Sequence, residues 1–307
     1  MMASLAAPLV ELAEVAQIEL FILKRMREFA TGDHASVFKG TGFNFAGLKD
    51  WEPGDAISSI DWAQSSLNNF SPMVTRDYEQ NSTATIVAVA DASLSTRCGA
   101  NGTLIMSAIA RSLAAVGLAA VMFQDMFGLV TFDDVFRQLA TVRPRIGKPH
   151  VVHCLDIYQH ARDSDSMIGR GDVVKAITAH LRKTSLVPVI SDFLFTDVAR
   201  VIRELTILNI AHDVFLMMVD VRFAFEFPDV SAGWLEVYDV ETGRTRTVSR
   251  REMSRLASHV EEWQEKTVHL ARDAGLDIVR VGLERWQMES SLVELVAARR
   301  LRKVKVA

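Results

Sequence analysis

Residues 84–91 read ATIVAVAD, an almost wholly apolar run that ends in an aspartate. An uninterrupted apolar run of this length, rich in valine and isoleucine, is typical of a strand that is covered on both faces. Residues 92–95, which read ASLS, follow it with two serines, as in a turn. The stretch therefore predicts a buried central strand with Asp91 at its carboxyl end.

Short apolar runs and helical patterns alternate through the rest of the chain. Further strands are expected at 127–132, 135–141, 186–190, 212–219 and 277–281. Helices are expected at 101–122, 150–160, 173–183, 198–208, 250–274 and 290–302. Strands that alternate with helices form parallel βαβ units, so the sequence predicts an α/β fold with a doubly wound, mostly parallel sheet.

The first 80 residues follow a different pattern. An amphipathic helix is expected within the first thirty, and residues 32–80 are rich in glycine, aromatic residues and turn signals. We expect this part to be an N-terminal helix followed by an irregular or β-rich elaboration packed on the sheet domain. The predicted units are therefore 1–80 and 81–307.

Composition limits the classes of function. The 34 basic and 38 acidic residues give a net charge of −4, which argues against nucleic-acid binding through a broad basic face. The most apolar window, 104–123, contains Arg111, and a central arginine costs at least about 2.5 kcal/mol in a bilayer. Acidic residues interrupt the N-terminal apolar stretches, unlike a signal peptide. We expect a cytoplasmic protein without a transmembrane segment, whose two cysteines are free thiols.

Aspartates follow three of the expected strands, at Asp91, Asp192 and Asp220. Ligand groups in doubly wound sheets lie beyond the carboxyl ends of the strands, so three carboxylates at one edge indicate a cation site. Capping of the following helix is the alternative role of each aspartate taken singly.

The loop after the first strand carries the sharpest pattern, in which Asp91, Ser93 and Ser95 alternate. One carboxylate and two hydroxyls aimed at one point suit Mg²⁺, or Mn²⁺, which takes oxygen ligands and keeps open positions for a partner's carboxylate. A metal-dependent phosphatase or hydrolase with Asp91 as nucleophile or metal ligand is the enzymatic alternative. Position 93 is serine, where aspartyl phosphotransferases use a second acid, and this disfavours the hydrolase.

A second motif lies in the N-terminal part, at 51–55 (WEPGD) and 60–62 (IDW). Its Pro-Gly pair forces a turn, and its tryptophans offer large apolar surfaces with a hydrogen-bonding edge. The segment serves either to pin this part to the domain or to recognise a partner, and the candidate partner-binding residues are Trp51, Asp55, Asp61 and Trp62.

The motifs together resemble a known family. They are Gly40-x-Gly42-x-x-Phe45, Pro53-Gly54-Asp55, Ile60-Asp61-Trp62, Arg76 to Glu79, Asp91-x-Ser93-x-Ser95, Ile190-Ser191-Asp192-Phe193, Asp220 and the stretch 239–243. The chain is similar, from about Gly40 to its C-terminal arginines, to the domain-of-unknown-function family that accompanies MoxR-type AAA+ ATPases and carries a von Willebrand factor A-like core.

This resemblance implies a function and a site. The family's members act as adaptors beside an ATPase, as found with methanol-oxidation or metalloenzyme maturation genes. Its metal-ion-dependent adhesion site assigns Asp91, Ser93 and Ser95 as ligands. The threonine ligand of that fold should fall near 171–172, where this sequence has Gly171 and Asp172, so Asp172 or Asp192 would compensate. Many relatives begin with transmembrane helices, and this chain resembles the branch without them.

A separate cluster, His150, His153, Cys154 and His160, shares one face of an expected helix. Imidazole and thiolate suit zinc or copper, whereas surface histidines on a helix are the simpler interpretation.

The sequence thus predicts a non-enzymatic adaptor that works with a MoxR-type AAA+ ATPase on a client metalloenzyme. Its metal edge would consist of Asp91, Ser93, Ser95 and Asp192, with Asp172 and Asp220 as further candidates. The alternatives are the metal-dependent hydrolase at the same edge and a structural scaffold with a vestigial metal loop.

Overall fold

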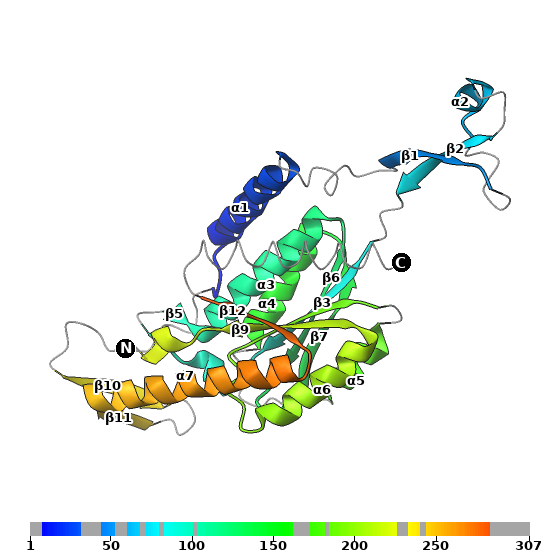
Figure 1. Cartoon of the computed structure of the whole chain (residues 1–307). Coiled ribbons are helices and arrows are strands. Elements are labelled where there is room, and N and C mark those ends of the chain that lie inside the picture. The colour runs from blue at the N-terminus through cyan, green and yellow to red at the C-terminus, as the bar shows by residue number, and fades with distance from the viewer. Residues whose placement is uncertain are drawn as a thin grey trace.

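A six-stranded sheet forms the centre of the computed structural model (Figure 1). The structure describes residues 8–31, 44–52, 60–67, 72–79, 83–100, 103–161, 172–181, 184–225, 233–239 and 244–282. The strands of the sheet are β3 (Thr85–Asp91), β6 (Met126–Phe132), β7 (Gln138–Arg145), β8 (Leu186–Ser191), β9 (Asp213–Val219) and β12 (Asp277–Val281). Their order across the sheet is β12-β9-β8-β3-β6-β7.

All of these strands run parallel except β7, which pairs antiparallel with β6 at one edge. Of these six strands, β3 comes first in sequence and lies in the middle of the sheet. The next two, β6 and β7, extend the sheet to one side, and β8, β9 and β12 extend it to the other. The chain therefore changes direction between β3 and β8, and this reversal is the topological switch point of a doubly wound sheet. The predicted fold class is confirmed, and the arrangement is consistent with a von Willebrand factor A-like core.

Helices cover both faces of the sheet (Figure 1). One core cluster joins Ile86, Ala88 and Ala90 of β3 to α1, α3 and α4, and the other joins Val87 and Val89 to α5, α6 and α7. These helices are α1 (Leu12–Thr31), α3 (Ile105–Met122), α4 (Lys148–His160), α5 (Val173–His180), α6 (Val198–Ala211) and α7 (Arg250–Asp273). Successive side chains of a strand point to opposite faces, which is why a continuously apolar β3 feeds both cores.

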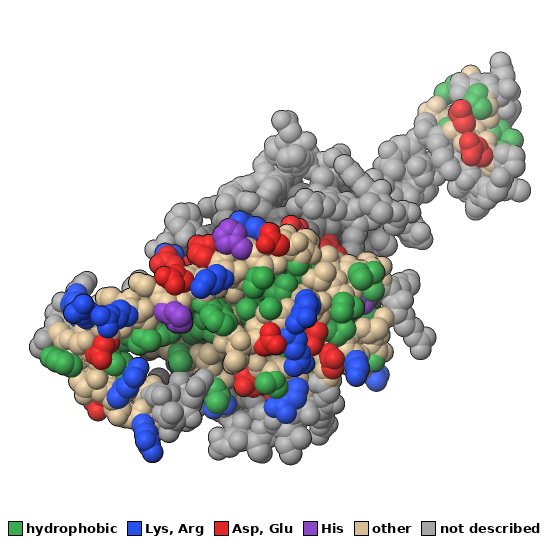
Figure 2. All heavy atoms as spheres, turned by 60° about the horizontal axis from the view of Figure 1, so that its bottom comes forward, with side chains coloured by type: hydrophobic (Ala, Val, Ile, Leu, Met, Phe, Trp, Pro, Cys, Tyr) green, Lys and Arg blue, Asp and Glu red, His purple; other side chains and the backbone are tan. Residues whose placement is uncertain are grey.

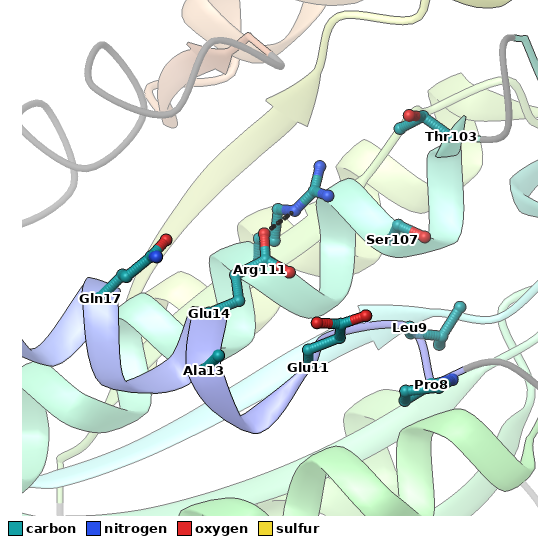
Figure 3. Close-up of a pocket in the computed structure, with 9 residues that line it drawn as sticks. All are labelled: Pro8, Leu9, Glu11, Ala13, Glu14, Gln17, Thr103, Ser107 and Arg111. Atoms are coloured by element: carbon teal, nitrogen blue, oxygen red, sulfur yellow. Dashed lines mark hydrogen bonds and ion pairs between the residues drawn. The ribbon is translucent and has the colours of Figure 1, made fainter.

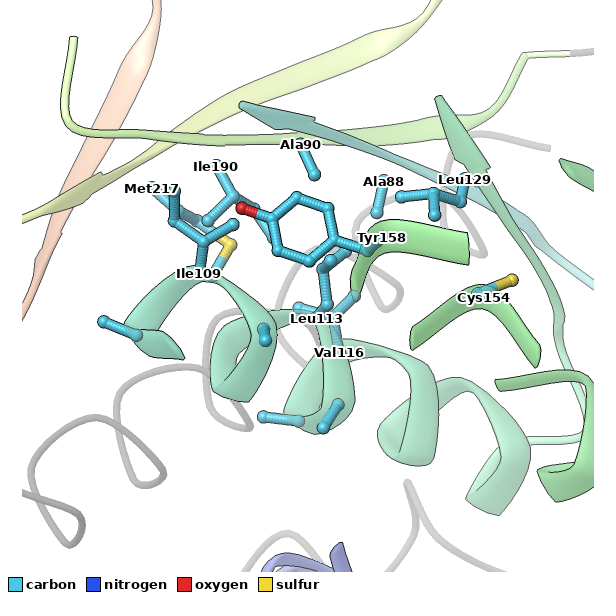
Figure 4. Close-up of a cluster of buried hydrophobic side chains, with 14 of the residues drawn as sticks. Ala88, Ala90, Ile109, Leu113, Val116, Leu129, Cys154, Tyr158, Ile190 and Met217 are labelled. Atoms are coloured by element: carbon cyan, nitrogen blue, oxygen red, sulfur yellow. The ribbon is translucent and has the colours of Figure 1, made fainter. Parts of the chain in front are cut away.

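Tyr158 of α4 connects the helical layer to the end of the central strand. Its ring is fully buried and lies against the small side chains of Ala88 and Ala90 (Figure 4). Its hydroxyl donates a hydrogen bond of 2.6 Å to the backbone oxygen of Asp91. A buried phenol needs such a partner, so α4 is held at the carboxyl end of β3.

Helix α3 is the most apolar element. Among the described residues it alone is long and apolar enough to cross a membrane, and 83% of it is buried inside the fold. Its Gly117 allows α4 to approach closely, since an added Cβ would lie 2.6 Å from a methyl group of Val151. The expectation of a core helix over 104–123 is met, although residues 103–104 are a short strand and not the first turn of the helix.

Helix α1 lies on α3 and α4 rather than with the segment that follows it in sequence. Val15, Ile18 and Ile22 are buried in the same core as β3. At the rim, Glu14 forms an ion pair of 2.6 Å with Arg111 of α3, and Glu19 pairs with Lys148 of α4. The apolar stripe between charged positions is what the amphipathic pattern predicts.

The other N-terminal elements are a hairpin of β1 (Asn44–Asp50) and β2 (Val74–Glu79), with α2 (Trp62–Leu67) between them in sequence. Figure 1 shows them apart from the sheet, whereas we expected this segment to pack on the sheet domain. Ile60 and Val74 are buried at this hairpin and helix. The boundary at residue 80 stays a prediction.

Two hairpins were not expected from the sequence. One is small, formed by β4 (Gly99–Ala100) and β5 (Thr103–Leu104) just after the loop that contains Asp91, Ser93 and Ser95. The other, β10 (Trp234–Asp239) and β11 (Arg244–Ser249), is inserted between β9 and α7. The expected terminal helix at 290–302 lies outside the described residues.

Candidate oxygen-ligand site at the sheet switch point

Four oxygen-bearing side chains meet where β3 and β8 end side by side. The Ser93 and Ser95 hydroxyl oxygens lie 3.0 Å apart, and the Ser95 hydroxyl donates to Asp192 Oδ2 at 2.9 Å. Asp91 and Asp192 lie close enough for the charge of one to act on the other. The structure therefore brings together Asp91, Ser93, Ser95 and Asp192, from two strand ends that are 100 residues apart in sequence, because the two strands are neighbours at the reversal of strand order.

The Asp91 carboxylate is held by its own turn and by the neighbouring strand. Oδ1 accepts a hydrogen bond of 2.8 Å from the Ser93 backbone N–H, and Oδ2 accepts one of 2.5 Å from the Ser191 hydroxyl. Ser191 is a site residue that the sequence analysis missed. Its signal was a hydroxyl directly before the aspartate that ends the strand.

The Asp192 loop is fixed from the side of α7. Asp192 Oδ1 accepts from the Leu194 N–H at 3.0 Å, and the Gln264 amide donates to the backbone oxygens of Asp192 at 3.2 Å and of Val219 at 2.8 Å. The Trp263 indole N–H donates to the Phe193 oxygen at 3.0 Å. Phe193 has φ +56°, a backbone conformation that non-glycine residues seldom adopt and that the surroundings must stabilise. Nothing in the spacing of α7 had pointed to Gln264 or Trp263.

Burial changes the acid–base behaviour of both carboxyl groups. Asp91 and Asp192 are fully buried, whereas Ser95 is partly exposed. Burial, and next the charge of Asp192, raises the pKa of Asp91 from its ordinary 3.8 to about 8, against the lowering effect of hydrogen bonds from Ser191 and Ser93. Burial also raises the pKa of Asp192, against hydrogen bonds from Leu194 and Ser95. Two buried carboxylates side by side are costly without a compensating charge.

These residues fit a hard divalent cation. The donor set consists of two carboxylates and hydroxyls, the oxygen ligands that Mg²⁺ and Mn²⁺ prefer, with no thiolate or imidazole. A cation would supply the positive charge that the buried pair lacks, and Asp91, Ser93, Ser95 and Asp192 are the residues that would hold it.

The two further candidates do not join this group. Asp172 caps α5, accepting from the Val174 N–H at 2.8 Å, and Asp220 binds the Arg222 guanidinium through both carboxylate oxygens. No group of three or more His, Cys, Asp or Glu side chains able to hold a metal is found among the described residues. Asp172 is thus a helix cap and Asp220 is part of an ion pair. The sequence alone cannot distinguish either role from metal ligation.

The comparison with protein families now identifies the chain's family. The sequence model of the family described as "Protein of unknown function DUF58" matches residues 48–267, which is more than half of the chain. The chain belongs to the DUF58 family. Among curated proteins, no sequence matches this DUF58 chain at a significant level.

Three solved structures resemble the DUF58 chain at low sequence identity. The conserved hypothetical protein BatB from Bacteroides thetaiotaomicron has a TM-score of 0.42 and 10% identity, over 73% of this chain and all of that one. An aerotolerance-related membrane protein from Bacteroides fragilis has a TM-score of 0.42 and 12% identity, over 70% of this chain and 99% of that one. The pilus adhesin SpaC from Lactobacillus rhamnosus GG has a TM-score of 0.38 and 11% identity, over 75% and 32%.

The candidate partner-binding residues lie in the N-terminal hairpin and helix of the DUF58 chain. Asp61 is buried, and its carboxylate accepts from the Gln64 N–H at 3.2 Å, so it caps α2. Trp62 is 57% exposed and Trp51 is half-buried. Asp55 lies outside the described residues. The structure thus gives Asp61 a local structural role and leaves the Trp62 ring at the surface.

The histidine and cysteine residues on α4 do not form a metal centre. Cys154 is buried, and its sulfur lies 3.8 Å from His150 Nε2, whereas His160 pairs with Asp156. Burial raises the pKa of the Cys154 thiol to about 12, so the thiolate that a metal would need is disfavoured. The described residues contain no third ligand for it, and the surface-histidine interpretation is the one that fits.

A separate hollow of about 380 Å³ lies between the start of α1 and α3 (Figure 3). Polar side chains line most of it, and the ion pair between Arg111 and Glu14 occupies one wall. None of Asp91, Ser93, Ser95 and Asp192 lines this hollow. It is therefore distinct from the oxygen-ligand site.

Proposed function

We propose that this DUF58 protein is a non-enzymatic adaptor that uses the Asp91–Asp192 edge, loaded with Mg²⁺, to bind a carboxylate of a partner. The observation that carries the proposal is the buried pair of carboxylates joined by serine hydroxyls at the switch point of the sheet. A bound Mg²⁺ would supply a positive charge with open coordination positions. Asp91 and Asp192 would anchor it, and the partly exposed Ser95 marks the side from which a partner approaches.

The partner we propose is a MoxR-type AAA+ ATPase, with a client metalloenzyme as the target of the pair. This step rests on the sequence motifs through which the chain resembles the MoxR-associated proteins. In this scheme the ATPase hydrolyses ATP, and the DUF58 protein holds the assembly together in the cytoplasm.

Calorimetric titration with Mg²⁺ and Mn²⁺ tests the metal. Asp91→Asn should weaken binding by at least about tenfold, as expected for loss of a group at a metal site. Asp156→Asn on the exposed face of α4 is the matched control, since among the described residues Asp156 pairs with the surface histidine His160. Equal affinity of the wild type and of Asp91→Asn for the metal would exclude the proposed ligand set.

Binding to the purified ATPase of the same organism tests the partner. Asp91→Asn, rather than a chelator, is the informative change, because the ATPase needs its own Mg²⁺. The adaptor proposal predicts loss of the complex with Asp91→Asn and retention with Asp156→Asn. Magnesium-dependent turnover of p-nitrophenyl phosphate by the isolated protein, abolished by Asp91→Asn, would instead support the hydrolase.

A further inference from the structure

The outer edge of β11 in the β10–β11 hairpin is not paired with another strand in the described part of the chain. The two strands pair with each other from Trp234↔Ser249 to Asp239↔Arg244, and within the described part of the chain neither pairs with another strand. Along β11, the residues from Arg244 to Thr247 are all exposed. An unpaired edge presents a row of backbone N–H and C=O groups that can pair with another chain.

One face of β11 carries two arginines, and the register places Asp239 of β10 directly across from the first of them, Arg244. Arg244 and Arg246 are two residues apart, so they point to the same face of β11. Arg246 of β11 and Arg255 of α7 both act on the carboxylate of Glu252, which places the strand and the start of the helix side by side. Glu252 itself is engaged by Ser249 in the capping box of α7.

The start of α7 extends the positive surface. A shallow hollow of about 410 Å³ there is lined by Arg251, Arg255, His259, Glu262 and two serines. Figure 2 shows Lys and Arg side chains gathered at the end of the molecule where this hairpin lies. This local excess of arginine stands out in a chain whose net charge is −4.

The opposite face of the ribbon carries two exposed aromatic side chains, with the exposed Glu236 between them along β10. Trp234 and Tyr238 are 64% and 54% exposed, and Tyr238 lies directly across from Thr245 of β11. A strand added beside β11 would place alternate side chains over the two faces, one set near Arg244 and Arg246 and the other near Thr245 and Tyr238.

We infer that the outer edge of β11 binds an extended acidic segment of a partner protein as a third strand. Backbone hydrogen bonds would supply affinity, and acidic side chains at every second position would pair with Arg244 and Arg246. Charge complementarity selects this occupant, because a cationic edge repels a second copy of itself. This inference does not depend on the metal site or on the identity of the ATPase.

Fluorescence anisotropy with a defined probe tests the inference. The probe is a fluorescein-labelled peptide of alternating glutamate and valine, flanked by threonine and glycine. Binding should weaken by at least tenfold with Arg244→Glu/Arg246→Glu and stay unchanged with Arg203→Glu/Lys266→Glu, which makes the same change of charge at exposed positions of α6 and α7. If the first variant does not fold by circular dichroism, Arg244→Gln/Arg246→Gln replaces it.

Two further probes separate strand addition from other kinds of binding. The same peptide with alternate backbone nitrogens methylated keeps its charges and loses N–H donors, so it should bind at least tenfold more weakly. Equal binding of the methylated peptide, or no effect of the β11 variants, would overturn the inference. So would a single-stranded thymidine oligonucleotide that displaces the peptide at a lower concentration than unlabelled peptide does.

Discussion

The carboxyl edge of the sheet and the β10–β11 hairpin differ in where they place charged side chains: the sheet edge buries them and the hairpin exposes them. At the sheet edge, Asp91 and Asp192 are fully buried and lie next to each other. On the hairpin, Arg244 and Arg246 project into solvent. Charges in water cost little to bring together, whereas buried like charges need protons, hydrogen bonds or a counter-ion. This difference is what the two proposals require, a cation site at the sheet edge and a docking edge on the hairpin.

The largest expected effect concerns the proton on Asp91 in the metal-free protein. Between about pH 4 and pH 8 the native state keeps this proton, since the pKa is raised to about 8, while the unfolded chain releases it. The unfolded state then binds fewer protons, so the free energy of unfolding should fall as pH rises through this range and level off above it. Urea unfolding in the presence of a chelator at several pH values measures this.

Asp91→Asn should make this decline smaller and leave the part that the raised pKa of Asp192 contributes, and Asp156→Asn should leave the profile unchanged. A wild-type profile without a decline between pH 4 and pH 8 would show that Asp91 does not carry a raised pKa, and the contrast between the sheet edge and the hairpin would then be lost.

Removal of the Gln264 amide should give the next largest effect. Gln264→Leu leaves the backbone oxygens of Asp192 and Val219 without this donor in a buried site. At about 1–3 kcal/mol for each of the two buried oxygens, we expect a loss of about 2–6 kcal/mol in the free energy of unfolding. Ser258→Ala, on the exposed side of α7, is the control and should change stability by less than about 0.5 kcal/mol.

A smaller effect is expected at Trp263. Trp263→Phe keeps most of the ring and removes the N–H that donates to Phe193 O, so the loss should be about 1 kcal/mol. The same variant should weaken Mg²⁺ binding if the backbone of the Asp192 loop positions the ligand. Unchanged stability together with unchanged Mg²⁺ affinity would mean that the left-handed conformation of Phe193 needs no support from α7.

The smallest effect is expected on the hairpin. Reversal of the charges of Arg244 and Arg246 should alter the free energy of unfolding by less than about 0.5 kcal/mol, since both side chains are solvated and water screens the action of Arg246 on the exposed Glu252. A loss of several kcal/mol in urea unfolding would show that the two arginines are structural, and the comparison with the sheet edge would fail on that side.

The sheet and its edge could be predicted from sequence because the end of an apolar strand is recognisable locally, and parallel strands end at the same edge of a sheet. An apolar run that ends in Asp91, and another that ends in Ser191 and Asp192, are enough to place both carboxylates at one edge once the strands are parallel. Asp220 carries the same local signal, and Asp172 was a candidate through the family resemblance. Their roles are decided by Arg222 and by a helix N-terminus, which strand patterns do not report.

The rest could not be predicted because its signals are not periodic or not local. The strands of the β10–β11 hairpin have only six residues each, and the four residues from Arg244 to Thr247 of β11 are all polar and exposed, so no alternation of apolar and polar residues marks this strand. Gln264 looks like any polar residue on an amphipathic helix until the folded chain brings it beneath two strand ends. Gln264 lies more than seventy residues from Asp192 in sequence, so a search for short motifs does not connect the two residues.

The apolar surface of α3 has a consequence for biosynthesis. This helix leaves the ribosome after β3 but before β6, β8 and β9, the strands that complete its cover, and β9 ends about a hundred residues later. At about 5–20 residues per second, a segment apolar enough for a bilayer would remain uncovered for seconds. Nascent chains stalled shortly after α3 should therefore depend on chaperones, and those that have completed β9 should not.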